Sequence, residues 1–184
     1  MKRLVVFALT SLLALLSASP AFAVIADRVL GVDVVGHVPA GDLSDATGLG
    51  LGAMLRYEGK LQNSMALTGR AGYVYGMEKE LDLGIAKISY GIDFIPVMVG
   101  VVYRTTGTPD GFFVTGEVGA NFVKAHASSG TIDDAYKTKI GANLGVGLRA
   151  EALSFRGGVN ILDLGHADTG LGLMVSVGWD FKRL

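Results

Sequence analysis

Along most of this chain apolar residues alternate with small or polar ones, and this pattern constrains the fold more than any other feature. It is clearest near the end of the chain, where one parity is apolar and the other is small or polar. The apolar set is Leu171, Leu173, Val175, Val177, Trp179 and Phe181, and the opposite set is Gly172, Met174, Ser176, Gly178 and Asp180. Successive side chains of a β-strand point to opposite faces of the sheet. The segment is therefore predicted to be a strand with one apolar face.

Similar alternation recurs in about eight segments of about ten residues, the pattern typical of transmembrane β-barrels. The predicted strands are 28–38, 47–57, 64–75, 89–103, 111–123, 138–148, 152–161 and 170–181. The mean hydropathy is +0.45, yet no apolar run after the first 23 residues reaches the ~18 residues of a membrane-spanning helix. Lipid offers no partners to backbone groups, and a closed sheet satisfies all of them. The sequence therefore predicts an all-β fold, a closed antiparallel eight-stranded up-and-down transmembrane β-barrel.

The first 23 residues have the features of a cleaved signal peptide. Lys2 and Arg3 precede an apolar stretch from Leu4 to Leu16, and Ala21-Phe22-Ala23 is a small-x-small cleavage site. Residues 24–184 then form one predicted domain. Cysteine is absent, so stability has to come from the closed ladder and from packing. A formal net charge of −1 gives no indication of a nucleic-acid partner.

The connections between the predicted strands alternate in length. The longer ones are 39–46, 76–88, 124–137 and 163–169, and the shorter ones are 59–63, 105–111 and the turn near Ala150-Glu151. Barrels of the bacterial outer membrane keep both termini and their short turns in the periplasm. The long connections are therefore expected outside the cell.

Glycine dominates the second face of many strands, which argues against the alternative of a soluble barrel or sandwich with that face in water. The interior of a narrow barrel fills by setting large side chains against small ones. A tight turn at Ala150-Glu151 would set Arg156 against Gly145, and a similar register would set Arg70 against Gly52. The predicted interior polar network, which fills the lumen, comprises Asp33, Arg56, Arg70, Asp93, Glu117, Lys139, Arg149, Arg156 and Asp180, with His37 on the same face.

The segment 89–103 changes parity at its middle. Tyr90, Ile92 and Phe94 are apolar at even positions, whereas Val97, Val99, Val101 and Tyr103 are apolar at odd ones. Proline cannot donate to a ladder and is tolerated at bulges, so we predict a β-bulge at Ile95-Pro96.

Aromatic residues gather near both ends of the predicted strands, as the two membrane interfaces favour. The periplasmic girdle is predicted to hold Tyr57, Tyr103, Phe112, Phe155, Trp179 and Phe181. The outer girdle is predicted to hold Tyr73, Tyr75, Tyr90 and Phe122, with Tyr136 nearby.

The chain resembles the small eight-stranded outer-membrane barrels. The resemblance rests on the alternating strands, on the segment from Ile95 to Arg104 and on the closing Gly178-Trp179-Asp180-Phe181. That family includes the membrane domain of outer membrane protein A, outer membrane protein X and opacity-type porins. The resemblance implies a monomer in the bacterial outer membrane, with lipid and lipopolysaccharide around it. It also implies periplasmic chaperones and the barrel-insertion machinery as partners during biogenesis. The function it implies is structural or surface-interacting, in envelope integrity or in adhesion through the outer loops.

Two other functions remain open at this point. A narrow polar path through the lumen would give porin-like conductance. A lipid A-modifying enzyme would need a nucleophile and a base near the outer rim. The nearest match to that arrangement is His126 and Ser128, with Asp133 or Asp134, but a polar loop explains them better. His166 and Asp168 are too few ligands for a metal site, so no catalytic residue, metal or cofactor is predicted.

Charged residues also mark the outer loops. Glu78, Glu80, Asp82, Asp133, Asp134 and Asp168 make the predicted tips acidic, and Lys79, Lys87, Lys124 and Lys137 lie near their base. Lysine binds phosphate as a point charge. These lysines are therefore candidates for contacts with lipopolysaccharide phosphates.

Overall fold

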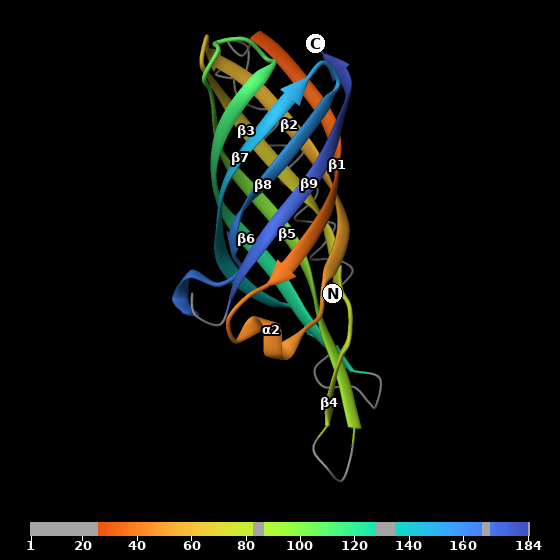
Figure 1. The fold of residues 1–184 in the computed structure, drawn as a ribbon. Coiled ribbons are helices and arrows are strands. Elements are labelled where there is room, and N and C mark those ends of the chain that lie inside the picture. Colours follow the sequence, from red (N-terminus) through yellow and green to blue (C-terminus); the bar gives the residue numbers. More distant parts are fainter. Residues whose placement is uncertain (1–25, 83–86, 128–134, 167–169, 184) are drawn as a thin grey trace.

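The computed structural model describes residues 26–82, 87–127, 135–166 and 170–183, and its strands close into a barrel (Figure 1). Each strand pairs antiparallel with its neighbours in the order β3-β2-β1-β9-β8-β7-β6-β5, and pairing of β3 with β5 closes the wall. The predicted eight-stranded closed barrel is confirmed. The predicted signal peptide, residues 1–23, lies outside the described residues.

The strands of the wall extend beyond several predicted ends, by up to five residues in β2. They are β1 (Ala26–Pro39), β2 (Gly50–Gln62), β3 (Met65–Gly76), β5 (Lys87–Arg104), β6 (Gly111–Ala127), β7 (Lys137–Ala150), β8 (Leu153–Ile161) and β9 (Leu171–Arg183). Three short elements were not predicted: the strand β4 (Lys79–Asp82), the helix α2 (Leu43–Ala46) and the 3-10 turn η2 (Leu164–His166). Within the described residues, no helix is long and apolar enough to cross a membrane.

The two ends of the barrel differ in their connections. Short turns join β2 to β3, β5 to β6 and β7 to β8 at one end, where β1 also begins and β9 ends (top of Figure 1). We name this the turn end. The opposite loop end carries α2, η2 and the hairpin of β4 and β5, which projects beyond the wall. The short connections thus lie at one end of the barrel and the longer ones at the other, as the sequence predicted.

The registers at two turns differ from the predicted ones. Arg70 lies opposite Arg56 rather than Gly52, and Arg156 lies opposite Gly147 rather than Gly145. The β2 strand continues to Gln62, and the turn after β7 begins at Glu151, whose φ of 54° is left-handed. Each observed register differs from the predicted one by an even number of residues, so the side chains of β2, β3, β7 and β8 keep their predicted faces.

The predicted bulge at Ile95-Pro96 is wrong. Ile95 pairs with Phe122 and Pro96 with Asn121 in one unbroken register between β5 and β6. On the other side of β5, the ladder to β3 is interrupted between Ala71–Val97 and Val74–Phe94. Proline, which has no N–H to donate, sits in that interruption. The backbone of β5 keeps its register through this segment. The apolar residues change parity because the lumen is apolar near the loop end, so apolar side chains of β5 face inward there.

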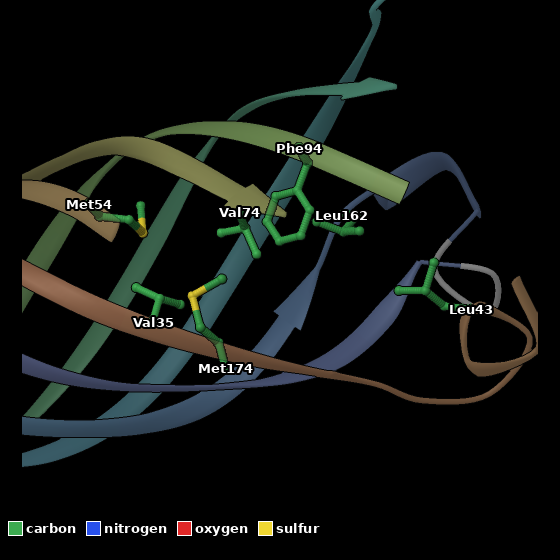
Figure 2. Packing of buried hydrophobic residues seen from close by; sticks show 7 residues of the cluster. All are labelled: Val35, Leu43, Met54, Val74, Phe94, Leu162 and Met174. Atoms are coloured by element: carbon green, nitrogen blue, oxygen red, sulfur yellow. The ribbon is translucent and has the colours of Figure 1, made fainter. Parts of the chain in front are cut away.

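The lumen near the loop end is apolar. A buried cluster there comprises Val35, Leu43, Met54, Val74, Phe94, Leu162 and Met174, and Ile92 and Val123 pack against it. Figure 2 shows Val74 beside the Phe94 ring, Val35 beside Met174, and Leu43 reaching the cluster from α2. His37, also buried, meets the Phe94 ring edge-on at 5.2 Å. Near the loop end, the even-numbered residues Ile92 and Phe94 of β5 therefore pack into this apolar part of the lumen.

The outward face is apolar along most of the wall. Leu144 is 68% exposed, and Val34, Phe112 and Val146 are similarly exposed. A soluble barrel would place these side chains in its core, so the structure argues against that alternative. Lipid is the environment that such a wall requires.

Candidate functional site: the filled lumen and the outer rim

The turn-end half of the lumen holds a network of buried ion pairs. Every side chain in it is at most 7% exposed. Its members, contributed by all eight strands of the wall, are Asp33, Arg56, Glu58, Arg70, Arg104, Glu117, Arg149, Arg156 and Asp180. We name this set the lumen network.

Glu58 is the carboxylate with the most partners in the lumen network. It accepts two hydrogen bonds from Arg149, at 2.7 and 2.9 Å, one from Arg56 at 2.9 Å and one from Arg104 at 2.8 Å. Arg156 lies 3.7 Å away. Charge-assisted hydrogen bonds of this kind are about twice as strong as neutral ones.

Glu117 and Asp33 extend the lumen network toward the middle of the barrel. Glu117 pairs with Arg70 at 3.2 Å and with Arg156 at 3.0 Å. Asp33 pairs with Arg70 at 3.1 Å and with Arg56 at 3.0 Å. The ring of Phe113 lies beneath Arg149 and Arg156, at 5.9 and 5.4 Å from their guanidinium carbons.

Glycines on neighbouring strands provide the space for these side chains. Arg56 lies opposite Gly31, Arg156 opposite Gly147, Glu117 opposite Gly100 and Asp33 opposite Gly178. The expectation that large side chains face glycines therefore holds, with partners other than the predicted ones. Since eight strands leave room only for side chains, the lumen network and the apolar cluster together fill the interior.

Two of the residues predicted for this network lie elsewhere. Asp93 faces outward, because β5 has no bulge and Asp93 shares the parity of Val97 and Val99. Lys139 lies on the inward face but at the loop-end mouth, where its Nζ is 2.7 Å from Asp163 Oδ2. The structure brings the other seven predicted residues together.

Glu58 and Arg104 were not among the predicted residues of the lumen network, because both lie one residue beyond a predicted strand end. The signal was present in the alternation itself. Glu58 continues the inward parity of Met54 and Arg56, and Arg104 continues that of Met98 and Val102. Following the parity through the turn would have found both.

A polar cluster lies on the outward face near the loop end. Asp93 accepts hydrogen bonds from the Tyr73 hydroxyl at 2.8 Å and from the Gly76 backbone N–H at 3.2 Å. The His126 ring stacks on Tyr75 at 5.3 Å, and its Nδ1 lies 3.5 Å from Asp93 Oδ1. Its Nε2 lies 3.9 Å from Glu78 Oε1.

The structure describes only some of the residues considered for an enzyme or a metal site. Ser128, Asp133, Asp134 and Asp168 lie outside the described residues. His166 lies 3.3 Å from Asp163. Across 26–82, 87–127, 135–166 and 170–183, no group of three His, Cys, Asp or Glu side chains is placed to hold a metal ion.

Most predicted girdle residues share the outward face. Tyr103, Phe112, Phe155, Trp179 and Phe181 are exposed near the turn end, and Tyr73, Tyr75 and Tyr136 are exposed near the loop end. Tyr57 and Phe122 are half-buried on the same face. Tyr90 is misassigned, because it shares the face of Ile92 and Phe94, which pack inward.

The hairpin of β4 and β5 leaves the wall at the loop end (Figure 1). Within the part of the chain that the structure describes, β4 pairs with β5 alone, from Lys79↔Tyr90 to Asp82↔Lys87. Glu78, Lys79 and Glu80 are exposed. The Lys79 ammonium donates to the Ser44 carbonyl at 2.6 Å, so this candidate phosphate ligand ties the hairpin to α2.

Comparison with known proteins gives matches at the level of structure. No protein-family model and no curated protein sequence matches the chain. The structure of Ail, the attachment invasion locus protein of Yersinia pestis, in complex with the heparin analogue sucrose octasulfate superposes with a TM-score of 0.59 at 15% identity. This match covers 87% of this chain and 99% of Ail. Another crystal structure of Ail gives a TM-score of 0.57 at 14% identity over the same shares of both chains.

Ail in a phospholipid bilayer nanodisc matches with a TM-score of 0.51 at 17% identity, over 83% of this chain and 99% of that one. At such identities the likeness is one of fold. It agrees with the closed antiparallel wall described above. The chain therefore has the fold of a small eight-stranded transmembrane β-barrel, the fold that its sequence predicts.

Proposed function

We propose that this protein is an integral monomer of the bacterial outer membrane and that it acts through its loop end, as an attachment surface outside the cell. The apolar outward wall supports insertion in lipid, with lipopolysaccharide around the loop end. The filled lumen supports a role other than transport. The signal peptide, the chaperones and the insertion machinery belong to the same proposal, as the route by which the chain reaches that membrane.

The main observation that supports this proposal is the projecting hairpin of β4 and β5. Four β4 residues pair with β5 beyond the wall, although the barrel closes without them. Glu78, Lys79 and Glu80 present both signs of charge to solvent there. Binding residues concentrate where a rigid scaffold holds out a loop. Ail, which shares this fold, is an attachment invasion locus protein and was solved with a heparin analogue; attachment is our proposal for this chain, and envelope integrity is the alternative role.

We further propose that the protein has no enzymatic activity. A lipid A-modifying enzyme needs a base oriented toward a nucleophile at the rim. Here the His126 ring is held against Tyr75, and its two nitrogens face the carboxylates of Asp93 and Glu78. Mass spectrometry of lipid A from expressing cells should therefore show no change in acylation.

A shortened hairpin tests the proposal. Replacing residues 78–90 with Asn-Gly should reconnect β3 to β5 by a two-residue turn and leave the barrel intact. Cells carrying this variant should attach less to epithelial cells and to heparin-coated surfaces at equal surface abundance. Thr108→Lys, at the turn end, is the matched control. Unchanged attachment with a folded, shortened barrel would refute the role of the hairpin, and increased antibiotic entry would favour envelope integrity instead.

A further inference from the structure

The hairpin of β4 and β5 leaves the wall at a gap in the sheet. The ladder between β3 and β5 ends at Val74↔Phe94, and the ladder between β4 and β5 begins at Lys79↔Tyr90. Residues 75–78 and 91–93, all of them described, do not pair with one another between these two ladders. We name these residues the hairpin base. Backbone N–H and C=O groups need partners when they are removed from water, so the groups that fill this gap decide how the hairpin projects.

Thr47, which follows α2 in the chain, fills the gap with its side chain. The residue is 4% exposed. Its Oγ1 accepts a hydrogen bond from the Ile92 backbone N–H at 3.2 Å and donates to the Met77 carbonyl oxygen at 3.4 Å. A Cβ at Gly76 would lie 2.8 Å from this oxygen, so the hydroxyl enters where the neighbouring residue has no side chain. One hydroxyl thus joins the two arms of the hairpin base.

The backbone after Thr47 binds the same part of the hairpin base. The Gly48 N–H donates to the Met77 carbonyl oxygen, and the Met77 N–H donates to the Leu49 carbonyl oxygen, each at 2.8 Å. A Cβ at Gly48 would lie 2.9 Å from the Met77 carbonyl oxygen. Both backbone polar groups of Met77 are therefore held by the residues that precede β2.

Leu43 anchors this segment inside the barrel. It is 5% exposed and reaches the apolar cluster of the lumen from α2 (Figure 2). The Thr47 backbone N–H donates to the Leu43 carbonyl oxygen at 3.1 Å, which ties the anchor to the residue in the gap. The hydrogen bond from Lys79 to the Ser44 carbonyl oxygen adds a contact from β4. Residues 43–49 therefore connect the lumen with the hairpin.

We propose that Thr47 is a positioning residue of the attachment surface. Its hydroxyl, held in place by the Leu43 anchor, sets the direction in which the hairpin of β4 and β5 projects. Without the hydroxyl, the Ile92 N–H would lose its partner, and the hairpin base would open more often. A two-stranded hairpin is only marginally stable by itself, and a mobile one loses more entropy on binding. A fixed hairpin should therefore attach more strongly, a consequence that rests on the function proposed above.

The test compares Thr47→Val, which removes the hydroxyl, with Thr47→Ser, which keeps it and serves as the matched control. Leu43→Ala is a second variant, which removes the anchor. The chain has no cysteine, so Asn63→Cys at the turn end and Glu80→Cys on β4 accept two spin labels in the folded full-length protein. The distance distribution between the labels reports the direction of the hairpin. Amide hydrogen exchange at Ile92, in unlabelled protein, reports opening of the hairpin base.

In Thr47→Val the distance distribution should broaden, and the Ile92 amide should exchange at least about tenfold faster, a loss of about 1.4 kcal/mol. Thr47→Ser should match the wild type, and Leu43→Ala should change both measurements in the same direction as Thr47→Val. Unchanged distances and exchange in Thr47→Val, or equal changes in Thr47→Ser, would overturn the proposal.

Attachment is measured separately, with unlabelled variants at equal surface abundance. A decrease in Thr47→Val and not in Thr47→Ser would support the positioning role in attachment. A broadened distance distribution with unchanged attachment would support the positioning of the hairpin by Thr47 and would refute the hairpin as the attachment surface. The two proposals therefore fail separately.

Discussion

Arg56 and Asp180 form an ion pair of 2.7 Å across an intervening strand. Arg56 lies on β2 and Asp180 on β9, and both lie opposite Gly31 of β1. A Cβ at position 31 would lie 2.8 Å from Arg56 Nη2, 3.1 Å from the Asp180 carboxylate and 2.8 Å from the Trp179 carbonyl oxygen. The pair therefore exists because residue 31 has no side chain.

Gly31→Ala should consequently destabilise the barrel by about 1–3 kcal/mol, the usual cost of overpacking. Gly157→Ala is the matched control, since a Cβ there meets no atom within 4 Å. That change should cost little or stabilise slightly, by reducing the entropy of the unfolded chain. Urea unfolding in lipid vesicles would measure both, and equal losses would contradict the close approach at Gly31.

Glu58→Gln should destabilise the barrel by about 3–5 kcal/mol, because breaking a buried network leaves uncompensated charge. Three arginines donate to this carboxylate. Asp45→Asn is the control, since Asp45 is an exposed aspartate 3.9 Å from Lys79 and exposed pairs contribute about 0–1 kcal/mol. Heat-modifiable migration on gels, together with urea unfolding, would compare them. A loss at Glu58 no larger than at Asp45 would mean that the network contributes nothing.

Leu144→Arg should hinder folding into lipid by about 2–4 kcal/mol if this residue lies near the bilayer midplane. Leu144 is 68% exposed on the outward face of β7. Thr138→Arg, on the same face six residues toward the loop end, should cost only about 0–1 kcal/mol at the interface. Folding yields into vesicles of defined composition would measure the difference. A similar cost at both positions would refute the assigned membrane depth.

Planar-bilayer recordings should show no large stable conductance steps. The apolar cluster fills the lumen near the loop end, and the lumen network fills it near the turn end, so an ion would have to pass both. Phe94→Ala combined with Met174→Ala removes two members of the apolar cluster. This variant should also lack large steps, since the lumen network remains. Stable steps in the wild-type protein would show that the lumen conducts and would restore the channel hypothesis.

The Lys139–Asp163 pair at the loop-end mouth should respond to acid. The hydrogen bond from Lys139 is the main cause that lowers the pKa of the Asp163 carboxyl, and the Gly165 backbone N–H adds to it. A lowered folded-state pKa means that this contribution to stability is present above the ordinary pKa of aspartate and is lost as the pH falls through the lowered one. The Gly165 amide resonance should therefore titrate below the ordinary range, and Lys139→Met should move its midpoint upward. An unchanged midpoint would contradict the pairing.

The alternation of residues such as Leu144 and Asn143 was enough to predict strands, faces and closure, because lipid and lumen demand opposite chemistry at every second position. It was also enough to assign Arg56, Arg70 and Glu117 to the interior. The predicted bulge shows where such inference ends. An apolar residue such as Phe94 satisfies either lipid or an apolar lumen, so its side cannot be read from polarity, and Asp93 was misplaced with it.

Only the tertiary structure decided which charges meet. Register shifts by even numbers leave the faces unchanged, so the alternation is the same whether Arg156 lies opposite Gly145 or Gly147. The turn at Glu151 and the extension of β2 to Gln62 fix these registers. The extension of β2 also brings Glu58 into the wall, and the extension of β5 brings in Arg104. The sequence by itself determined that this chain forms a barrel with polar residues inside; the closure of the wall decided how those residues pair, because ion pairs between distant strands depend on register and not on local pattern.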